Sequence, residues 1–179
     1  IHALRASYRA GGLSCLQAIE EVLRRIAEAG DDKVWISRAT DADLRVTAAR
    51  LDARKSEFDS LPLFGVPFAV KDNIDVAGLP TTAACPGFAY TPQASAEVVQ
   101  RLVKAGAIVV GKTNLDQFAT GLNGTRLLYG ACANSFDPAY VSGGSSSGSA
   151  VSVALGQVSF SLGTDTDRKS TRLNSSHIP

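Results

Sequence analysis

The stretch Gly143-Gly144-Ser145-Ser146-Ser147-Gly148-Ser149-Ala150 leads from a loop into a helix of small residues, which the sequence predicts from Ser149 to Gly156. Glycines at such a junction let backbone N–H groups approach a ligand, and the start of a helix favours negative charge. Serine hydroxyls both donate and accept hydrogen bonds. A flexible linker is the alternative interpretation, but linkers rarely run directly into an apolar helix. The stretch therefore indicates proton relay or oxyanion binding.

Upstream of this stretch, amphipathic helices alternate with short apolar strands. The spacing of apolar residues predicts helices over 15–29, 41–54 and 94–105, and strands over 34–36, 68–70, 107–110 and 158–162. Ser14 is a suitable N-cap for the first helix, which would turn Leu16 and Ile19 inward. This alternation is typical of an α/β fold, a sheet flanked by helices. Ligand sites in such folds gather at strand ends and helix starts.

The composition excludes several classes of function. The chain has 179 residues, 45% of them apolar, and a net charge of +1, which gives no electrostatic footprint for nucleic acid. No apolar run has the length of a membrane helix, and three widely spaced cysteines are typical of a cytoplasmic protein with reduced thiols. The only histidines are His2 and His177, so neither a metal site nor a Ser-His-Asp triad is expected. A serine nucleophile here would need a different base, and lysine is the candidate.

Lys71 is the lysine best placed for that role. It follows the apolar strand predicted at 68–70 and precedes Asp72-Asn73. Strand-end lysines usually extend to water, and that interpretation stays open for Lys71. A lysine drawn into an apolar pocket instead loses its charge readily and becomes a usable general base.

A second motif offers a function of a different class. Residues Gly106 to Thr113 match the nucleotide-binding pattern GxxxxGK[ST], which makes a nucleotide-binding module an alternative. The pattern requires a loop between its glycines, whereas Ala-Ile-Val-Val at 107–110 predicts a buried strand. Lys112 is then expected to be a solvated charge at the strand end.

The terminal segment, residues 167–179, is polar and shows no periodicity. In one reading frame, the common sequencing-library adapter translates to the eleven residues 167–177. We therefore expect 1–166 to be the N-terminal part of a domain and 167–179 a non-native tail. Because the chain contains no methionine, it is also expected to lack its true start.

Three motifs resemble the amidase signature family, in the family's order and spacing. They are Gly65-Val66-Pro67 followed by Lys71-Asp72-Asn73, then residues 143–148, then Gly163-Thr164-Asp165-Thr166. The resemblance covers about 61–166. It implies an α/β/α sandwich around a mixed β-sheet, of which only the N-terminal part is present. It also implies amide hydrolysis by a serine–serine–lysine relay without metal or cofactor.

The resemblance assigns roles to individual residues. Lys71 would be the base, and Ser145, after a cis peptide bond, would be the serine that passes the proton. Gly143, Gly144, Ser146 and Ser147 would shape the loop around it, and Ala119 and Thr166 would bind substrate or oxyanion. The nucleophilic serine is expected at position 169, which is Lys169 here. The chain as written is therefore predicted to be inactive.

Within the family, residues 65–90 and 114–125 are most similar to the allophanate hydrolase subfamily. That subfamily implies a small-molecule amide substrate, release of ammonia and carbon dioxide in urea degradation, and a functional link to urea carboxylase. It also implies a cytoplasmic homodimer for the full-length protein, with neither nucleic acid nor membrane as partner. The alternatives within the family are the amidotransferase subunit that acts on mischarged transfer RNA and another small-amide amidase.

Overall fold

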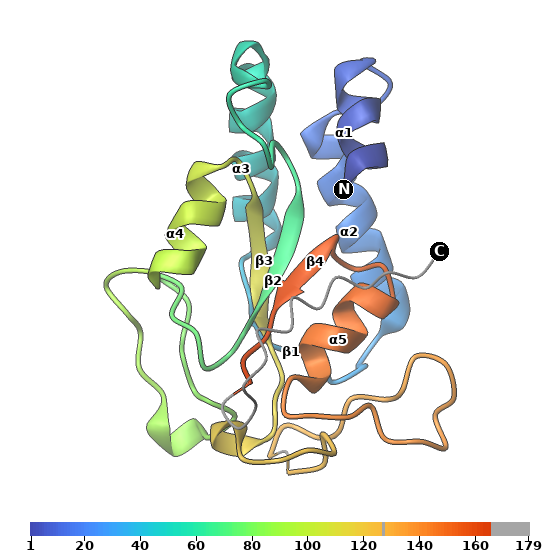
Figure 1. The fold of residues 1–179 in the computed structure, drawn as a ribbon, viewed down its shortest axis with the longest axis vertical. Helices are drawn as coiled ribbons and strands as arrows, with labels where there is room; N and C mark the ends of the chain where they lie inside the picture. The colour runs from blue at the N-terminus through green and yellow to red at the C-terminus, as the bar shows by residue number, and fades with distance from the viewer. Residues whose placement is uncertain (127, 166–179) are drawn as a thin grey trace.

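A computed structural model describes residues 1–126 and 128–165. Four strands form one sheet in the order β1-β3-β2-β4 (Figure 1). Their bounds are β1 (Trp35–Arg38), β2 (Pro67–Lys71), β3 (Ile108–Thr113) and β4 (Phe160–Leu162). β2 runs parallel to both β3 and β4, while β1 is antiparallel to β3. The predicted mixed sheet flanked by helices is confirmed.

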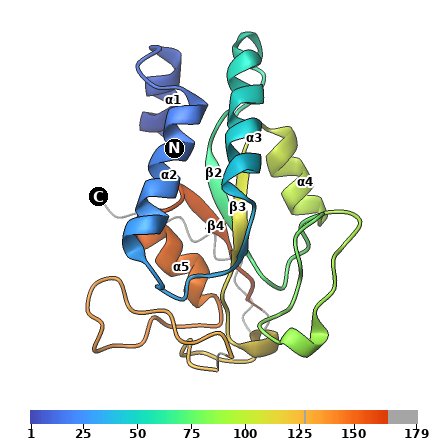
Figure 2. The same cartoon turned by 180° about the vertical axis from the view of Figure 1, so that it is seen from behind.

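Helices cover both faces of the sheet, as two opposite views show (Figure 1, Figure 2). The α-helices are α1 (His2–Arg9), α2 (Cys15–Ala29), α3 (Asp41–Ala53), α4 (Glu97–Lys104) and α5 (Ser147–Ala154). Short 3-10 helices are η1 (Lys55–Glu57), η2 (Pro86–Phe88) and η3 (Gln117–Ala119). One face of the sheet packs on α2 and α3, and the other packs on α4 through Val99, Phe68 and Val70.

Local chemistry explains the two longest helices. Ser14 and Gln17 form a reciprocal capping box at the start of α2, and Gly30 follows its last residue. Thr40 caps α3 by accepting a hydrogen bond from Asp43 N. Both helices agree with the predicted ranges to within one residue. Leu16, however, is 36% exposed and does not share the buried face of Ile19, so that part of the prediction is wrong.

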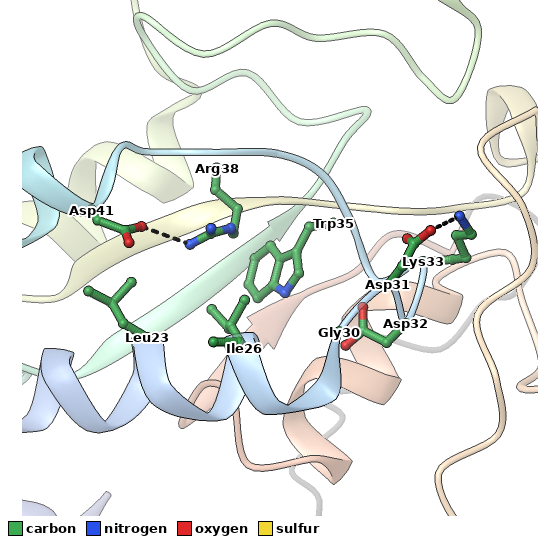
Figure 3. Close-up of a pocket in the computed structure, with 10 residues that line it drawn as sticks. Leu23, Ile26, Gly30, Asp31, Asp32, Lys33, Trp35, Arg38 and Asp41 are labelled. Carbon is green, nitrogen blue, oxygen red and sulfur yellow. Dashed lines mark hydrogen bonds and ion pairs between the residues drawn. The ribbon is translucent and has the colours of Figure 1, made fainter.

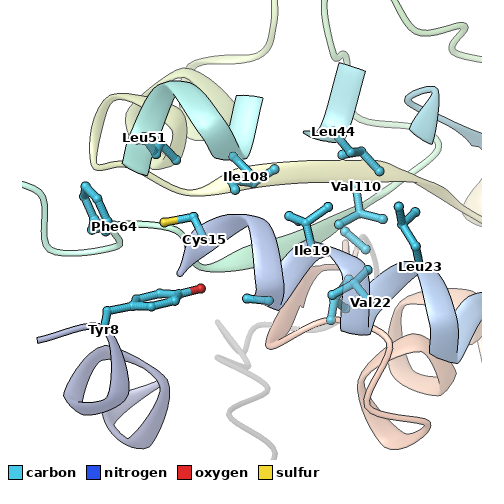
Figure 4. Close-up of a cluster of buried hydrophobic side chains, with 14 of the residues drawn as sticks. Tyr8, Cys15, Ile19, Val22, Leu23, Leu44, Leu51, Phe64, Ile108 and Val110 are labelled. Carbon is cyan, nitrogen blue, oxygen red and sulfur yellow. The ribbon is translucent and has the colours of Figure 1, made fainter. Parts of the chain in front are cut away.

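The main core lies between α2, α3 and the sheet (Figure 4). Ile19, Val22 and Leu23 of α2 pack in one cluster with Leu44 of α3, and Ile108 and Val110 of β3 lie between the two helices in this view. Burial of side chains of this kind contributes about 1.5–3 kcal/mol each. Helix α1, which the apolar pattern did not predict, is held by Tyr8, whose hydroxyl donates to Gly65 O at 2.9 Å.

The other boundaries shift by a few residues. β1 spans 35–38 where 34–36 was expected, and β4 begins at Phe160, two residues late. α4 begins three residues after position 94, and α5 begins at Ser147 where Ser149 was expected. β3 continues three residues past Val110, to Thr113.

A β-bulge in β3 changes which side chains face each side of the sheet. The register moves from Phe68↔Val109 to Ala69↔Gly111, so Val110 is an extra residue on β3. Beyond the bulge, Lys112 pairs with Val70, and Thr113 pairs with Lys71. Lys71 and Thr113 therefore share the face that α5 covers, while Lys112 lies on the face of α4.

Candidate active site

Lys71, the last residue of β2, is fully buried. Its Nζ donates to Ser145 Oγ at 2.8 Å and to Thr164 Oγ1 at 2.8 Å. A longer bond of 3.3 Å reaches the Thr164 carbonyl. The interpretation of Lys71 as a lysine extended into water is therefore wrong.

Burial changes the acid–base chemistry of Lys71. Removal of the ammonium from water lowers the pKa of Lys71 to about 8, and the negative charges of Asp116 and Asp165 partly oppose this shift. An amine with such a pKa is neutral in a substantial fraction of molecules at mildly alkaline pH. Lys71 can then accept a proton from a hydroxyl at hydrogen-bond distance.

The segment that bears Ser145 is fixed mainly by backbone contacts. The peptide bond between Gly144 and Ser145 is cis. Gly144 N donates to Leu122 O at 2.8 Å, and Ser145 O accepts from Asp116 N at 3.0 Å. Gly143 has a φ of +79°, a left-handed conformation that side chains disfavour.

Helix α5 begins directly after this segment and packs tightly on the sheet. A Cβ on Gly148 would lie 2.6 Å from Asn114 N and 2.7 Å from Val34 O, so no larger residue fits. The Ser149 and Thr113 hydroxyls lie 2.8 Å apart, and Ser149 also donates to Leu162 O at 2.9 Å. The loop residue Ser146 reaches Thr164 O at 3.2 Å, whereas Ser147 is the buried first residue of α5.

Thr164 is a site residue that sequence reasoning did not single out. Its hydroxyl accepts from both Lys71 Nζ and Asn73 Nδ2, the latter at 3.1 Å. The motif 163–166 was recognised as part of the resemblance, but nothing in the sequence shows that Thr164 would contact the amine. The contact arises because β4 lies beside β2.

Among the remaining predicted residues, Ala119 is described by the structure but does not contact this pair through a hydrogen bond. Ala119 ends η3 with a φ of +58°, and its N–H donates to Asp116 O at 2.7 Å. No hydrogen bond joins it to Lys71 or Ser145 within residues 1–126 and 128–165, so its connection to them runs through Asp116. Thr166, Lys169 and the tail at 167–179 lie outside the described residues.

Lys112 is buried, which makes the predicted solvated strand-end charge wrong. It forms an ion pair with Asp72 at 3.0 Å and donates to Pro80 O at 3.1 Å. Desolvation lowers the pKa of Lys112, and the charge of Asp72 opposes this effect. The nucleotide-binding interpretation required a loop over Gly106 to Thr113, but residues 108–113 form a strand. That alternative therefore has no phosphate loop.

We expect Lys112→Met to destabilise the chain by about 3–5 kcal/mol, because it leaves the Asp72 carboxylate buried without its cation. The double variant with Asp72→Asn removes both charges and should recover much of that loss. Urea unfolding of the single and double variants measures the difference. Equal or greater destabilisation in the double variant would contradict a paired buried charge.

A cavity of about 300 Å³ lies elsewhere, at the C-terminal end of α2 (Figure 3). Trp35, Leu23 and Ile26 line its apolar side. Four of its charged side chains form two ion pairs, Arg38–Asp41 at 3.3 Å and Lys33–Asp31. None of the Lys71–Ser145 residues lines this cavity.

Residues 1–126 and 128–165 hold no cluster of three or more His, Cys, Asp or Glu side chains arranged for a metal ion. Within these residues, no helix combines the length and apolar character needed to cross a membrane.

Known proteins share the sequence and the fold of this chain. The family model described as Amidase matches residues 17–176, and the chain belongs to that family. Urea amidolyase of Saccharomyces cerevisiae is 54% identical over 151 residues, which are 84% of this chain and 8% of that protein. The A-type subunit of the glutamyl-tRNA(Gln) amidotransferase of Symbiobacterium thermophilum is 42% identical over 91% of this chain and 34% of that protein.

Solved structures agree with the sequence matches. Kluyveromyces lactis allophanate hydrolase superposes with a TM-score of 0.79 and 48% identity, over 90% of this chain and 27% of that one. The chain thus spans from less than a tenth to about a third of the length of these relatives.

Proposed function

We propose that the complete protein hydrolyses allophanate through a relay in which Lys71 is the base and Ser145 passes the proton. The observation that carries the proposal is the 2.8 Å contact between a buried lysine amine and the Ser145 hydroxyl. A neutral amine in that position can take the serine proton without any histidine.

In the proposed reaction, a second serine attacks the amide carbonyl. Its proton moves to Ser145 while the Ser145 proton moves to Lys71, and an ester forms to the acyl group. The C–N bond then breaks, and the nitrogen leaves as ammonia with the proton that Lys71 returns through Ser145. Water hydrolyses the ester by the same relay.

The nucleophile of this scheme belongs at position 169, where the chain has Lys169. We therefore propose that the 179-residue chain does not itself turn over amides. Thr166 and Ala119 stay candidates for oxyanion or substrate contacts. The cytoplasmic homodimer and the link to urea carboxylase likewise stay predictions.

Allophanate is favoured over glutamine by similarity. Identity is 54% to urea amidolyase and 42% to the amidotransferase polypeptide. Both relatives extend well beyond the region that this chain matches, which makes a direct test possible.

In the test, residues 1–165 of this chain replace the corresponding residues of each relative. The rest of the relative then provides the nucleophilic serine. We expect the urea amidolyase chimaera to release ammonia from allophanate, and the amidotransferase chimaera to be much less active with glutamine. We also expect kcat/KM to rise with pH and to level off above about 8, since Lys71 must be neutral. The 179-residue chain alone serves as the inactive control. If only the amidotransferase chimaera were active, glutamine would replace allophanate as the assigned substrate.

A further inference from the structure

Asp116 is a buried carboxylate with an unusual set of partners. Its side chain is fully buried, and among the described residues no cation lies within ion-pair distance of it. Its two oxygens accept backbone N–H groups instead, from Gly124 at 3.1 Å and Arg126 at 2.9 Å. A buried carboxylate is costly unless other groups compensate its charge.

The same residue contacts three segments around the relay. Its backbone N–H donates to Ser145 O at 3.0 Å, and its carbonyl accepts from Ala119 N at 2.7 Å. Its carboxylate occupies the space where a Cβ on Gly144 would lie, only 2.1 Å from Oδ2. Asp116 therefore joins the 121–126 loop and η3 to the segment that bears Ser145.

The charge of Asp116 also acts on Lys71. The acidic groups whose charges raise the pKa of Lys71 are Asp116, after β3, and Asp165, after β4. Asp72 is next to Lys71 in sequence but is paired with Lys112 on the other face of the sheet. Asp165 is exposed, so water screens its field, whereas the field of buried Asp116 is screened much less.

We propose that Asp116 is a positioning residue of the relay, whose backbone holds the Ser145 segment and whose buried charge keeps the Lys71 amine able to carry a proton. The inference rests on the proposed roles of Lys71 and Ser145. If burial alone set the pKa of Lys71, the protonated amine would lose its proton too readily. It could not hold the proton between its removal from serine and its delivery to the leaving nitrogen. Asp116 supplies the opposing negative charge.

The experiment follows the Lys71 side chain in the 179-residue chain by NMR, with ¹³C-labelled lysine. The resonance that disappears in Lys71→Arg is assigned to Lys71 ¹³Cε. Its chemical shift is then measured as a function of pH, which gives the titration midpoint of the amine. Asp116→Asn should lower the midpoint by about one pH unit or more, since an opposite charge is lost. Asp32→Asn is the matched control, because Asp32 also accepts a backbone N–H, from Val34 at 2.9 Å, and should leave the midpoint unchanged. An unchanged or raised midpoint in Asp116→Asn overturns the proposal.

A measurement on the unaltered chain covers the case in which Asp116→Asn does not fold. Raising the salt concentration from 0.1 M to about 1 M shortens the Debye length from about 10 Å to about 3 Å and screens exposed charges. If buried Asp116 is the main partner, the Lys71 midpoint should hardly move. A large downward shift would assign the role to exposed Asp165 and overturn the proposal. Neither measurement needs a nucleophile, so both are independent of whether the chimaera hydrolyses allophanate.

The active chimaera distinguishes an effect of the Asp116 charge from a purely structural effect of Asp116. Asp116→Asn should move the acidic limb of kcat/KM to lower pH, in the same direction as the NMR midpoint. A purely structural role would lower kcat/KM at every pH and leave the limb in place, which would overturn the charge part of the proposal.

Discussion

Lys71→Ala in the urea amidolyase chimaera is expected to slow acylation by about 10³-fold, the range typical of a lost general base. The amine of Lys71 is fully buried and donates to the Ser145 hydroxyl at 2.8 Å. Without this amine, Ser145 has no acceptor for its proton. The rise of kcat/KM with pH that levels off above about 8 should then also disappear. Single-turnover release of ammonia measures the step directly.

Two controls make this result specific. Lys104→Ala removes an exposed lysine at the end of α4 and should leave the rate unchanged. Methylamine added to Lys71→Ala should restore part of the rate, since the cavity left by the side chain can admit a small amine. Near-normal turnover by Lys71→Ala would refute its role as the base.

Gly148→Ala is expected to destabilise the chain by about 3 kcal/mol or more, the upper range for overpacking. The added Cβ would meet Asn114 N at 2.6 Å, Val34 O at 2.7 Å and Asn114 O at 2.9 Å. These are backbone atoms beside β3 and β1, and they cannot rotate away as a side chain would. Helix α5 would have to move off the sheet, together with the Ser145 segment that precedes it.

Gly87→Ala is the matched control for that prediction. No heavy atom lies within 4 Å of a Cβ at Gly87, and its φ is not left-handed, so its stability should change little. Urea unfolding of both variants gives the comparison. A Gly148→Ala chain as stable as Gly87→Ala would show that α5 does not approach β3 this closely.

The elements predicted correctly from sequence are those with local causes. Helices α2 and α3 have their apolar faces within their own residues, and their N-caps, Ser14 and Thr40, directly precede them. The pairing of Lys71 with Ser145 was inferred from motifs, and the two residues do lie in contact. Their catalytic roles stay proposals.

What sequence reasoning missed depends on contacts between distant segments. Lys112 was assigned to solvent because the bulge at Val110, which turns it toward Asp72, has no local pattern. Thr164 contacts Lys71, and Asp116 contacts Ser145, only because the order of the strands in the sheet brings these distant segments together. Helix α1 was missed because Tyr8 is its single buried side chain, which leaves no apolar periodicity in the sequence.

The contacts of the Lys71 amine have a consequence for biosynthesis. Ser145 lies 74 positions after Lys71 in the chain, and Thr164 lies 93 positions after it. While the ribosome is still adding the residues between them, Lys71 has neither partner and stays hydrated as an ordinary charged ammonium. A neutral Lys71 amine at mildly alkaline pH thus appears only after translation has passed β4, so a nascent chain holds no reactive amine.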